Sequence, residues 1–307
     1  MKRIFCIVLS IIVGAVFLFS GYSKLFPIEP FQFNFIAIGV ANWLTAPVIA
    51  RLLIAIEFFL GTLLILNFRL PQFTLKAVIG ILLFFTLYLL FQIITEGNQG
   101  NCGCFGEMLK MTPLQSIFKN IAMLVIVVFL LISKHSVSWK WNNEIYFIVA
   151  TTAIFVTVGL NPFDYNAAKI VKDEITNLPL PTDTLYHSKN TIPPTIDLKK
   201  GKQIVCFFSL KCRHCLDAAF KINILKNQNP QMPFYYILGG VNENLQPFLQ
   251  QSKHKNVPYT LYNDMYFFTM CGGAYPGIYY CENGRIKKKG NIYTLNAESI
   301  NKWLMEK

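Results

Sequence analysis

Charged residues are scarce in this chain of 307 residues, since Asp, Glu, Lys and Arg make up only 14% of it while 53% is hydrophobic. A soluble globular domain carries about 25% charged residues. The deficit is confined to the first half of the chain, which excludes a purely soluble protein. We expect a membrane segment joined to a soluble one.

Acidic residues are the scarcest charged type, 16 against 28 Lys and Arg, which gives a net charge of +12. Such a balance suits a nucleic-acid-binding protein, but the lysines are dispersed along the C-terminal half and form no recognition motif. We therefore expect no nucleic-acid partner. We interpret the charge as a solvated basic surface that faces anionic lipid.

Histidine is rare too: there are four, and they do not cluster. A zinc site needs further Cys or His ligands at metal spacing, whereas Cys206, Cys271 and Cys281 stand singly. We therefore expect no metal site. Eight cysteines that include two close pairs are typical of an oxidising compartment.

Five apolar segments are long enough to cross a bilayer, because about 20 apolar residues span its hydrocarbon core. They cover about 4–23, 47–66, 75–95, 116–133 and 145–161. Lys2 and Arg3 precede the first segment and no cleavage site follows it, which predicts an uncleaved helix with a cytoplasmic N-terminus. The basic residues of the loops that should also be cytoplasmic are Arg69, Lys76, Lys134 and Lys140.

An odd number of spans places the C-terminal half and the loop 96–115 on the same, outer side. That loop contains Cys102 and Cys104, with Gly103 between them. Glycine permits the backbone angles of a tight ring, and a strained disulfide tends to be labile and exchange-active. A static disulfide and a metal-binding loop are the alternatives.

Arg51 and Glu57 lie in the second span. An ionisable residue inside a membrane is a functional candidate, so both are candidates for a membrane relay, with a quinone as the candidate electron partner. The alternatives are a buried hydrogen-bonding role for Glu57 and extension of Arg51 to the interface.

The second cysteine pair is Cys212 and Cys215, in the order apolar strand, C-x-x-C, helix. A helix N-terminus favours a thiolate on the first cysteine, and the spacing of three brings Cys215 beneath it. His214 adds a second positive partner when protonated. This pattern predicts a thiol–disulfide exchange site. A structural disulfide and half of a zinc site are the alternatives.

The soluble half alternates strands and helices. The expected strands are 203–209, 233–239, 258–262, 277–281 and 285–289, and the helices about 213–227, 243–252 and 296–306. Asn283-Gly284 marks a hairpin. We expect a polytopic helical membrane domain over 1–161, a proline-rich linker over 162–194, and an α/β thioredoxin-like domain over 195–307.

The membrane half resembles the MauE/DoxX-like family, MauE being the methylamine utilisation protein. The matching pieces are Phe19-Ser20-Gly21-Tyr22-Ser23-Lys24, Ala50-Arg51-Leu52-Leu53-Ile54-Ala55-Ile56-Glu57 and Asn101-Cys102-Gly103-Cys104-Phe105-Gly106. The resemblance implies a compact helical bundle that helps to assemble disulfide-containing periplasmic proteins. Family members are thought to work beside a separate thioredoxin-like protein.

The soluble half resembles the TlpA/MauD-like branch of the thioredoxin family. The resemblance implies a cis peptide bond before Pro276 and a substrate-positioning role for Tyr275. The chain departs from ordinary thioredoxins at Cys206, where they carry a buried carboxylate. The roles of Cys6, Cys206, Cys271 and Cys281 stay open.

Together these patterns predict a membrane-bound thiol–disulfide oxidoreductase of the bacterial inner membrane, with its thioredoxin-like domain in the periplasm. Its partners would be the thiols and disulfides of periplasmic proteins, and we expect no tightly bound cofactor. In this prediction Cys212, Cys215, Cys102, Cys104 and His214 carry the chemistry. The alternatives are a copper chaperone and a non-catalytic assembly factor.

Overall fold

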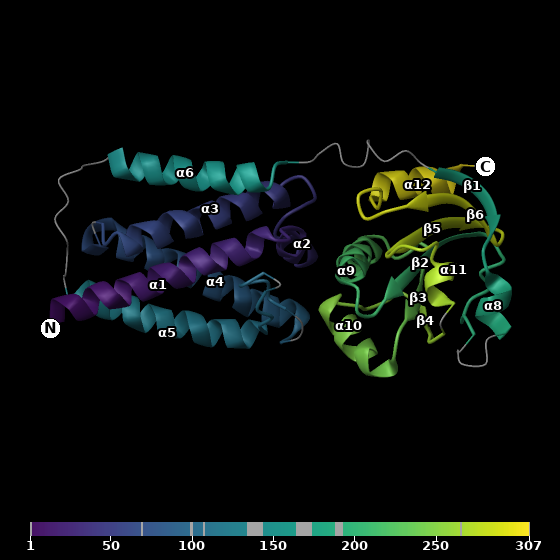
Figure 1. The fold of residues 1–307 in the computed structure, drawn as a ribbon, viewed down its shortest axis with the longest axis horizontal. Helices are drawn as coiled ribbons and strands as arrows, with labels where there is room; N and C mark the ends of the chain where they lie inside the picture. The colour runs from purple at the N-terminus through teal and green to yellow at the C-terminus, as the bar shows by residue number, and fades with distance from the viewer. Residues whose placement is uncertain are drawn as a thin grey trace. The chain divides into compact units, whose positions relative to one another are not determined.

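The computed structural model describes residues 2–68, 70–98, 101–106, 108–133, 144–163, 174–187, 193–264 and 266–306. The chain divides into two compact units, Met1–Phe163 and Asp164–Lys307, which are described separately (Figure 1). Arg69, Lys134 and Lys140, expected in cytoplasmic loops, lie outside the described residues.

The regular elements that the structure describes in the first unit are helices. Its elements are α1 (Lys2–Leu25), α2 (Glu29–Ala37), α3 (Ala46–Ile65), the π-helical turn η1 (Leu70–Thr74), α4 (Leu75–Glu96), α5 (Pro113–Ile132) and α6 (Glu144–Leu160). Four helices are long and apolar enough to span a membrane, namely α1, α3, α4 with its preceding turn, and α5. The fifth expected span is the shorter apolar helix α6, of 17 residues.

Close helix packing holds this unit together. Gly14 of α1 and Gly61 of α3 face each other, and a methyl group on Gly14 would lie 2.8 Å from the Gly61 carbonyl oxygen. Small residues at helix crossings allow this approach inside membranes. Helix α4 packs on α5, and α6 lies beside α3 (Figure 1). A capping box of Thr112 and Gln115 begins α5.

The loop that carries Cys102 and Cys104 lies at one end of the helical unit, which we call the cysteine end. Here α1, α4 and α6 end, and α3 and α5 begin. The Asn161 side chain, just after α6, donates to the Leu25 carbonyl at the end of α1 at 2.9 Å. Arg51 near the start of α3 donates to the carbonyls of Asn161 and Pro162 at 2.8 and 3.1 Å. The chain therefore leaves this unit at the cysteine end.

The second unit is built on one six-stranded sheet, in the order β1-β6-β5-β2-β3-β4. The strands are β1 (Glu174–Pro179), β2 (Lys202–Ser209), β3 (Phe234–Gly239), β4 (Tyr259–Tyr262), β5 (Gly277–Glu282) and β6 (Arg285–Gly290). Strands β2, β3 and β4 are parallel, and β5, β6 and β1 continue the sheet antiparallel. This is the thioredoxin-like order, which confirms the expected fold class.

Helices cover both faces of this sheet. They are α8 (Thr182–His187), α9 (Arg213–Gln228), α10 (Leu245–Gln251) after the 3₁₀ turn η2 (Asn242–Asn244), α11 (Phe267–Met270) and α12 (Ala297–Met305). On one face the Tyr236 hydroxyl donates to the Ala219 carbonyl of α9, and Trp303 of α12 packs on Tyr280. On the other face Leu185 of α8 and Phe267 of α11 join the buried core.

The prediction of a linker over 162–194 is wrong for part of that range. The segment contributes strand β1, paired with β6, and helix α8. Leu180 and Leu185 are buried in the core of the second unit, and the Leu180 N–H donates to the Gly284 carbonyl. An edge strand tolerates its terminal Pro179 because its outer side needs no ladder partner.

Candidate functional site

The C-x-x-C pair lies at the start of α9. Cys212 is the N-cap residue, and its Sγ accepts a hydrogen bond from the Cys215 backbone N–H at 3.4 Å. The Cys212 N–H in turn donates to the carbonyl of Ser209, the last residue of β2, at 3.0 Å. The turn between strand and helix thus holds one sulfur at the positive end of the helix dipole.

The two sulfurs of this pair differ in environment. Cys212 is partly exposed, whereas Cys215 is fully buried. A hydrogen bond from the Cys215 thiol, the helix N–H groups and the charge of the exposed His214 together lower the pKa of Cys212 to about 6, against the opposing effect of burial. Burial raises the pKa of Cys215 far above its usual range. An accessible thiolate beside a buried thiol is the arrangement that thiol–disulfide exchange needs.

Pro276 and Tyr275 lie at the same edge of the sheet as the cysteine pair. Gly277 pairs with Phe207 near the end of β2, so the preceding proline lies beside the strand that leads into Cys212. The Tyr275–Pro276 bond is cis, as the resemblance implies. The Tyr275 ring stacks on Phe267 at 5.8 Å, and its hydroxyl interacts electrostatically with Cys215 and Cys212.

The other cysteines of this unit are buried free thiols. Cys206 pairs with Ile278 and Gln203 with Cys281, so Cys206 and Cys281 point to opposite faces of the sheet. The register of the two strands therefore excludes a disulfide between Cys206 and Cys281. Cys271 lies close enough to influence Cys215 electrostatically, and its thiol contacts the carbonyls of Phe268 and Ala274 at 3.1 and 3.5 Å.

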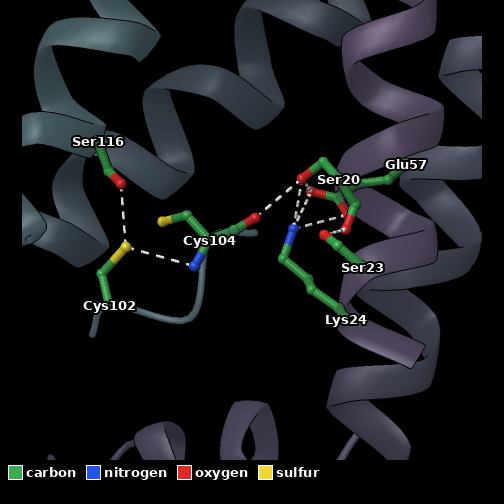
Figure 2. Close-up of polar contacts among 7 residues, drawn as sticks. All are labelled: Ser20, Ser23, Lys24, Glu57, Cys102, Cys104 and Ser116. Carbon is green, nitrogen blue, oxygen red and sulfur yellow. Dashed lines mark hydrogen bonds and ion pairs between the residues drawn. The ribbon is translucent and has the colours of Figure 1, made fainter. Parts of the chain in front are cut away.

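The C-x-C pair lies in the loop between α4 and α5, at the cysteine end of the helical unit. The Cys104 N–H donates to the Cys102 Sγ at 3.3 Å, and that sulfur lies 3.0 Å from the Ser116 Oγ of α5 (Figure 2). Gly106 closes the loop with a φ of +54°, and a Cβ there would lie 1.9 Å from the Ser23 carbonyl oxygen. The loop therefore requires glycine where it contacts α1.

A buried ion pair lies beside this loop. The Lys24 Nζ at the end of α1 lies 2.6 and 2.8 Å from the two carboxylate oxygens of Glu57 in α3, and both side chains are almost fully buried. The Ser20 Oγ accepts from Lys24 and lies 3.0 Å from both the Glu57 carboxylate and the Cys104 carbonyl oxygen (Figure 2). The pair thus connects the cysteine loop to α1 and α3.

Glu57 is a buried hydrogen-bonding residue that is connected to the cysteine loop through Ser20, and its role in a membrane relay stays a prediction. Sequence reasoning missed Lys24, which appears there only as the last residue of a family-like segment. The available signal was its position within one turn of an apolar span, where an ionisable side chain needs a partner. A second missed residue is Lys119, which the sequence shows only as a single charge near the start of the fourth span.

Arg51 does not join this cluster. Its guanidinium donates to the carbonyls of Pro47, Asn161 and Pro162, and it lies 4.3 Å from the ring centre of Phe163. These contacts tie the end of α6 to the start of α3. These contacts of Arg51 go to backbone carbonyls, and its role in a membrane relay stays a prediction.

A cavity of about 30 Å³ lies where the loop meets the helices. Its ionisable lining groups are Lys24, Glu57, Tyr88, Cys102, Cys104 and Lys119. A hydrogen bond from Cys102, with the charges of Lys119 and Lys24, lowers the pKa of Cys104 to about 6, while burial opposes the shift. Burial raises the pKa of Cys102. The pair therefore has one thiol that ionises easily and one that does not.

Comparisons with known proteins agree with both halves of this description. Residues 2–133 match the family model described as methylamine utilisation protein MauE, which confirms the resemblance of the helical unit. Protein TlpB of Flavobacterium psychrophilum is 27% identical over 338 aligned residues, which cover 94% of this chain and 91% of the relative. The match spans both units.

Two solved structures are similar to the C-terminal part. One is a secreted disulfide oxidoreductase of Mycobacterium tuberculosis described as homologous to DsbE of E. coli, with 15% identity, coverage of 34% of this chain and 78% of that chain, and a TM-score of 0.27. The other is a thioredoxin domain of a thiol-disulfide oxidoreductase from Bacteroides vulgatus, with 14% identity, coverage of 35% and 82%, and a TM-score of 0.29. In general terms, the chain is a multi-pass membrane protein with an α/β domain of thioredoxin-like topology.

Proposed function

We propose that this chain is a thiol–disulfide oxidoreductase of the cell envelope, in which Cys212 exchanges disulfides with proteins outside the cytoplasm. The observation that carries the proposal is the asymmetry of the C-x-x-C pair. Cys212 caps α9, is accessible and has a pKa of about 6, while Cys215 is buried beneath it.

The reaction follows from this asymmetry. The Cys212 thiolate attacks a disulfide of a partner protein and forms a mixed disulfide, and one partner thiolate leaves. Cys215 then attacks the Cys212 sulfur, and the second partner thiolate leaves. Two electrons and two protons pass to the partner, and Cys212–Cys215 becomes a disulfide. The steps in reverse oxidise a partner dithiol. Tyr275 and Pro276, at the same sheet edge, would receive the extended partner segment.

The C-x-C pair is the proposed redox partner of this domain. Support comes from the helical unit alone, because the Cys102/Cys104 loop and the exit of the chain after α6 lie at the same end of it. The chain therefore leaves the helical unit at the end that carries the loop. The exposed Arg3 and Lys76 lie at the opposite ends of α1 and α4. By the positive-inside rule that end is cytoplasmic, which puts both cysteine pairs in the periplasm of an inner-membrane protein.

Trapping tests the proposal. Cys215→Ser in the full chain should accumulate a mixed disulfide at Cys212, because the resolving thiol is gone. Mass spectrometry would identify the partner protein. Part of the product should be internal, joining Cys212 to Cys102 or Cys104. Cys212→Ser is the matched control and should trap nothing at this site. A Cys215→Ser variant that accumulates no mixed disulfide in an oxidising envelope contradicts the proposal.

The membrane orientation has its own test. In intact cells, a membrane-impermeant maleimide should label Cys212. After mild denaturation of the part of the protein that lies outside the cytoplasm, the same reagent should also label Cys104. Labelling of the two residues from opposite sides of the bilayer would rule out direct exchange between the pairs. A quinone as the onward electron partner stays a prediction.

A further inference from the structure

The charges around the C-x-C loop do not balance, and two of the three, Lys24 and Glu57, are buried while Lys119 is half-buried. Among the described residues that line the cavity, Lys24 and Lys119 carry positive charges and Glu57 carries the negative one. Glu57 is paired with Lys24 through both of its oxygens. Lys119 lies 4.4 Å from the ring centre of Phe105, next to Cys104 in the loop. One positive charge in this cavity thus has no fixed anion among the described residues.

A thiolate on Cys104 would supply the missing negative charge. Lys119 and Lys24 both act electrostatically on this sulfur, and the sulfur of Cys102 lies within reach of its backbone N–H. The buried hydroxyl of Tyr88, which also lines the cavity, has no hydrogen-bond partner among the described residues. A buried hydroxyl of this kind can donate a hydrogen bond to an acceptor that enters the cavity.

The two sulfurs of the loop are not equivalent. The Cys102 Sγ is held by contact with the Ser116 Oγ and the Cys104 N–H, and the residue is 1% exposed against 8% for Cys104. The Cys104 carbonyl is fixed by Ser20, which is bonded to Lys24 (Figure 2). The loop therefore fixes the backbone of Cys104, and the Cys104 side chain lines the same cavity as Lys24 and Lys119, beside Cys102 and Ser116.

We propose that Cys104 is the attacking sulfur of the membrane pair and Cys102 the resolving one, with Lys119 as the cation that stabilises the Cys104 thiolate. The Lys24–Glu57 pair and Ser20 are positioning residues that fix the loop. The assignment rests on the proposed function, since it gives roles to the two sulfurs within that exchange.

The step is a balanced thiol–disulfide exchange. The Cys104 thiolate attacks one sulfur of a partner disulfide, and a bond forms between them as the partner's S–S bond breaks. The leaving thiolate takes up a proton. Cys102 then attacks the Cys104 sulfur, and its proton goes to the second partner thiolate. The membrane pair is oxidised by two electrons, and the partner disulfide is reduced to a dithiol.

The pH dependence of the reaction distinguishes the two sulfurs. The charged or titratable groups that face Cys104 are Lys24 of α1, Glu57 of α3, Tyr88 of α4, Lys119 of α5 and Cys102 of the loop. The probe is 4,4′-dithiodipyridine, a small disulfide, with full-length protein in detergent micelles that carries Cys212→Ser and Cys215→Ser. The release of 4-thiopyridone is followed from pH 5 to 9, and a variant that also lacks Cys102 and Cys104 gives the background.

With Cys102→Ser added, the serine hydroxyl can replace the hydrogen bond from the Cys102 thiol, and the rate of the remaining Cys104 should reach half its maximum below the ordinary pKa of a thiol. With Cys104→Ser added instead, the rate of Cys102 should still be rising at pH 9. The midpoint is the better readout than the rate, because a thiolate of low pKa is also a weaker nucleophile. Lys119→Met should raise the Cys104 midpoint by about one unit or more, and Lys119→Arg should leave it unchanged. The exposed Lys76, at the other end of the unit, is the matched control, and Lys76→Met should change nothing.

A lower midpoint for Cys102 than for Cys104 overturns the order of attack. An unchanged midpoint in Lys119→Met overturns the role of Lys119. If Lys119→Met does not fold, the comparison of the two cysteine variants and the Lys119→Arg variant still decides the assignment. The proposed function fails separately, through the absence of a trapped disulfide in Cys215→Ser, because the small probe reports on the loop whatever its natural partner is.

Discussion

Replacing Glu57 by Gln removes the carboxylate from the ion pair beside the cysteine loop. The Lys24 ammonium, 2% exposed, loses two oxygens at 2.6 and 2.8 Å and keeps the Ser20 hydroxyl and one amide oxygen. Breaking a buried pair by removing one partner costs about 3–5 kcal/mol, because the remaining charge is left without compensation. We expect about 3 kcal/mol for Glu57→Gln, which keeps an acceptor. Lys24→Met should cost about 5 kcal/mol, since it leaves a carboxylate with Ser20 alone.

The double variant tests whether the two charges compensate each other. Lys24→Met with Glu57→Gln leaves no charge of the pair, so it should cost clearly less than the sum of the single changes. The assay is thermal unfolding of the full chain in detergent, followed by far-ultraviolet circular dichroism, and the single variants should melt on the order of 10 °C lower. Glu29→Gln, a partly exposed carboxylate in α2, is the control and should have little effect. Additive costs, or a Glu57→Gln variant as stable as the parent, would refute the reasoning.

Three further changes have defined outcomes. Alkylation of Cys212 should be half-maximal near pH 6, and His214→Ala should move this midpoint upward. Because the pKa of Cys212 is lower in the folded than in the unfolded protein, the reduced protein should gain stability as the pH rises from 6 towards 9 and lose it as the pH falls through 6. Urea unfolding at several pH values measures this change. Gly106→Ala should destabilise the helical unit by about 2–5 kcal/mol through its positive φ and its clash with Ser23, whereas Gly80→Ala, which has open space, should be neutral in the same melting experiment. Arg51→Met should free the end of α6 and speed proteolysis after Leu160, and Arg51→Lys should not restore protection, because an ammonium lacks the guanidinium fork that reaches several carbonyls.

Elements with a local signal were predicted well from the sequence. The strand before Cys212 and the helix after it follow from an apolar run and a capping cysteine, and the structure places them at Lys202–Ser209 and Arg213–Gln228. Asn283 and Gly284 both have positive φ angles, as a two-residue hairpin requires. The spans follow from the length of apolar sequence that a bilayer demands.

Features that depend on distant partners were missed. Strand β1 is six residues long, and its pairing partner β6 lies more than 100 residues later, so no periodicity within 162–194 could distinguish it from a linker. The ion pair of Lys24 was missed for the same reason, since its partner Glu57 is 33 residues away. The charge at the end of an apolar span was visible, but whether it reaches water or a carboxylate is decided by the packing of α1 on α3. Lys119 lines the cavity because α5 packs against the cysteine loop, which the sequence around Lys119 does not indicate.

The two cysteine pairs reach a similar electrostatic state by partly different means. In both pairs the hydrogen bond from the partner thiol lowers the pKa of the attacking sulfur most; Cys212 has in addition the N–H groups of α9, whereas Cys104 has the charges of Lys119 and Lys24. Because each attacking sulfur has a pKa near 6, thiolate stabilisation favours the reduced form of both pairs to a similar degree. It therefore does not set the direction of electron flow between them. The direction must come from the disulfides, and a closed C-x-C ring, being the tighter, would be the more strained and so the more oxidising of the two. We therefore expect electrons to pass from Cys212 and Cys215 to the membrane pair, with the soluble domain as an oxidant of its partner proteins.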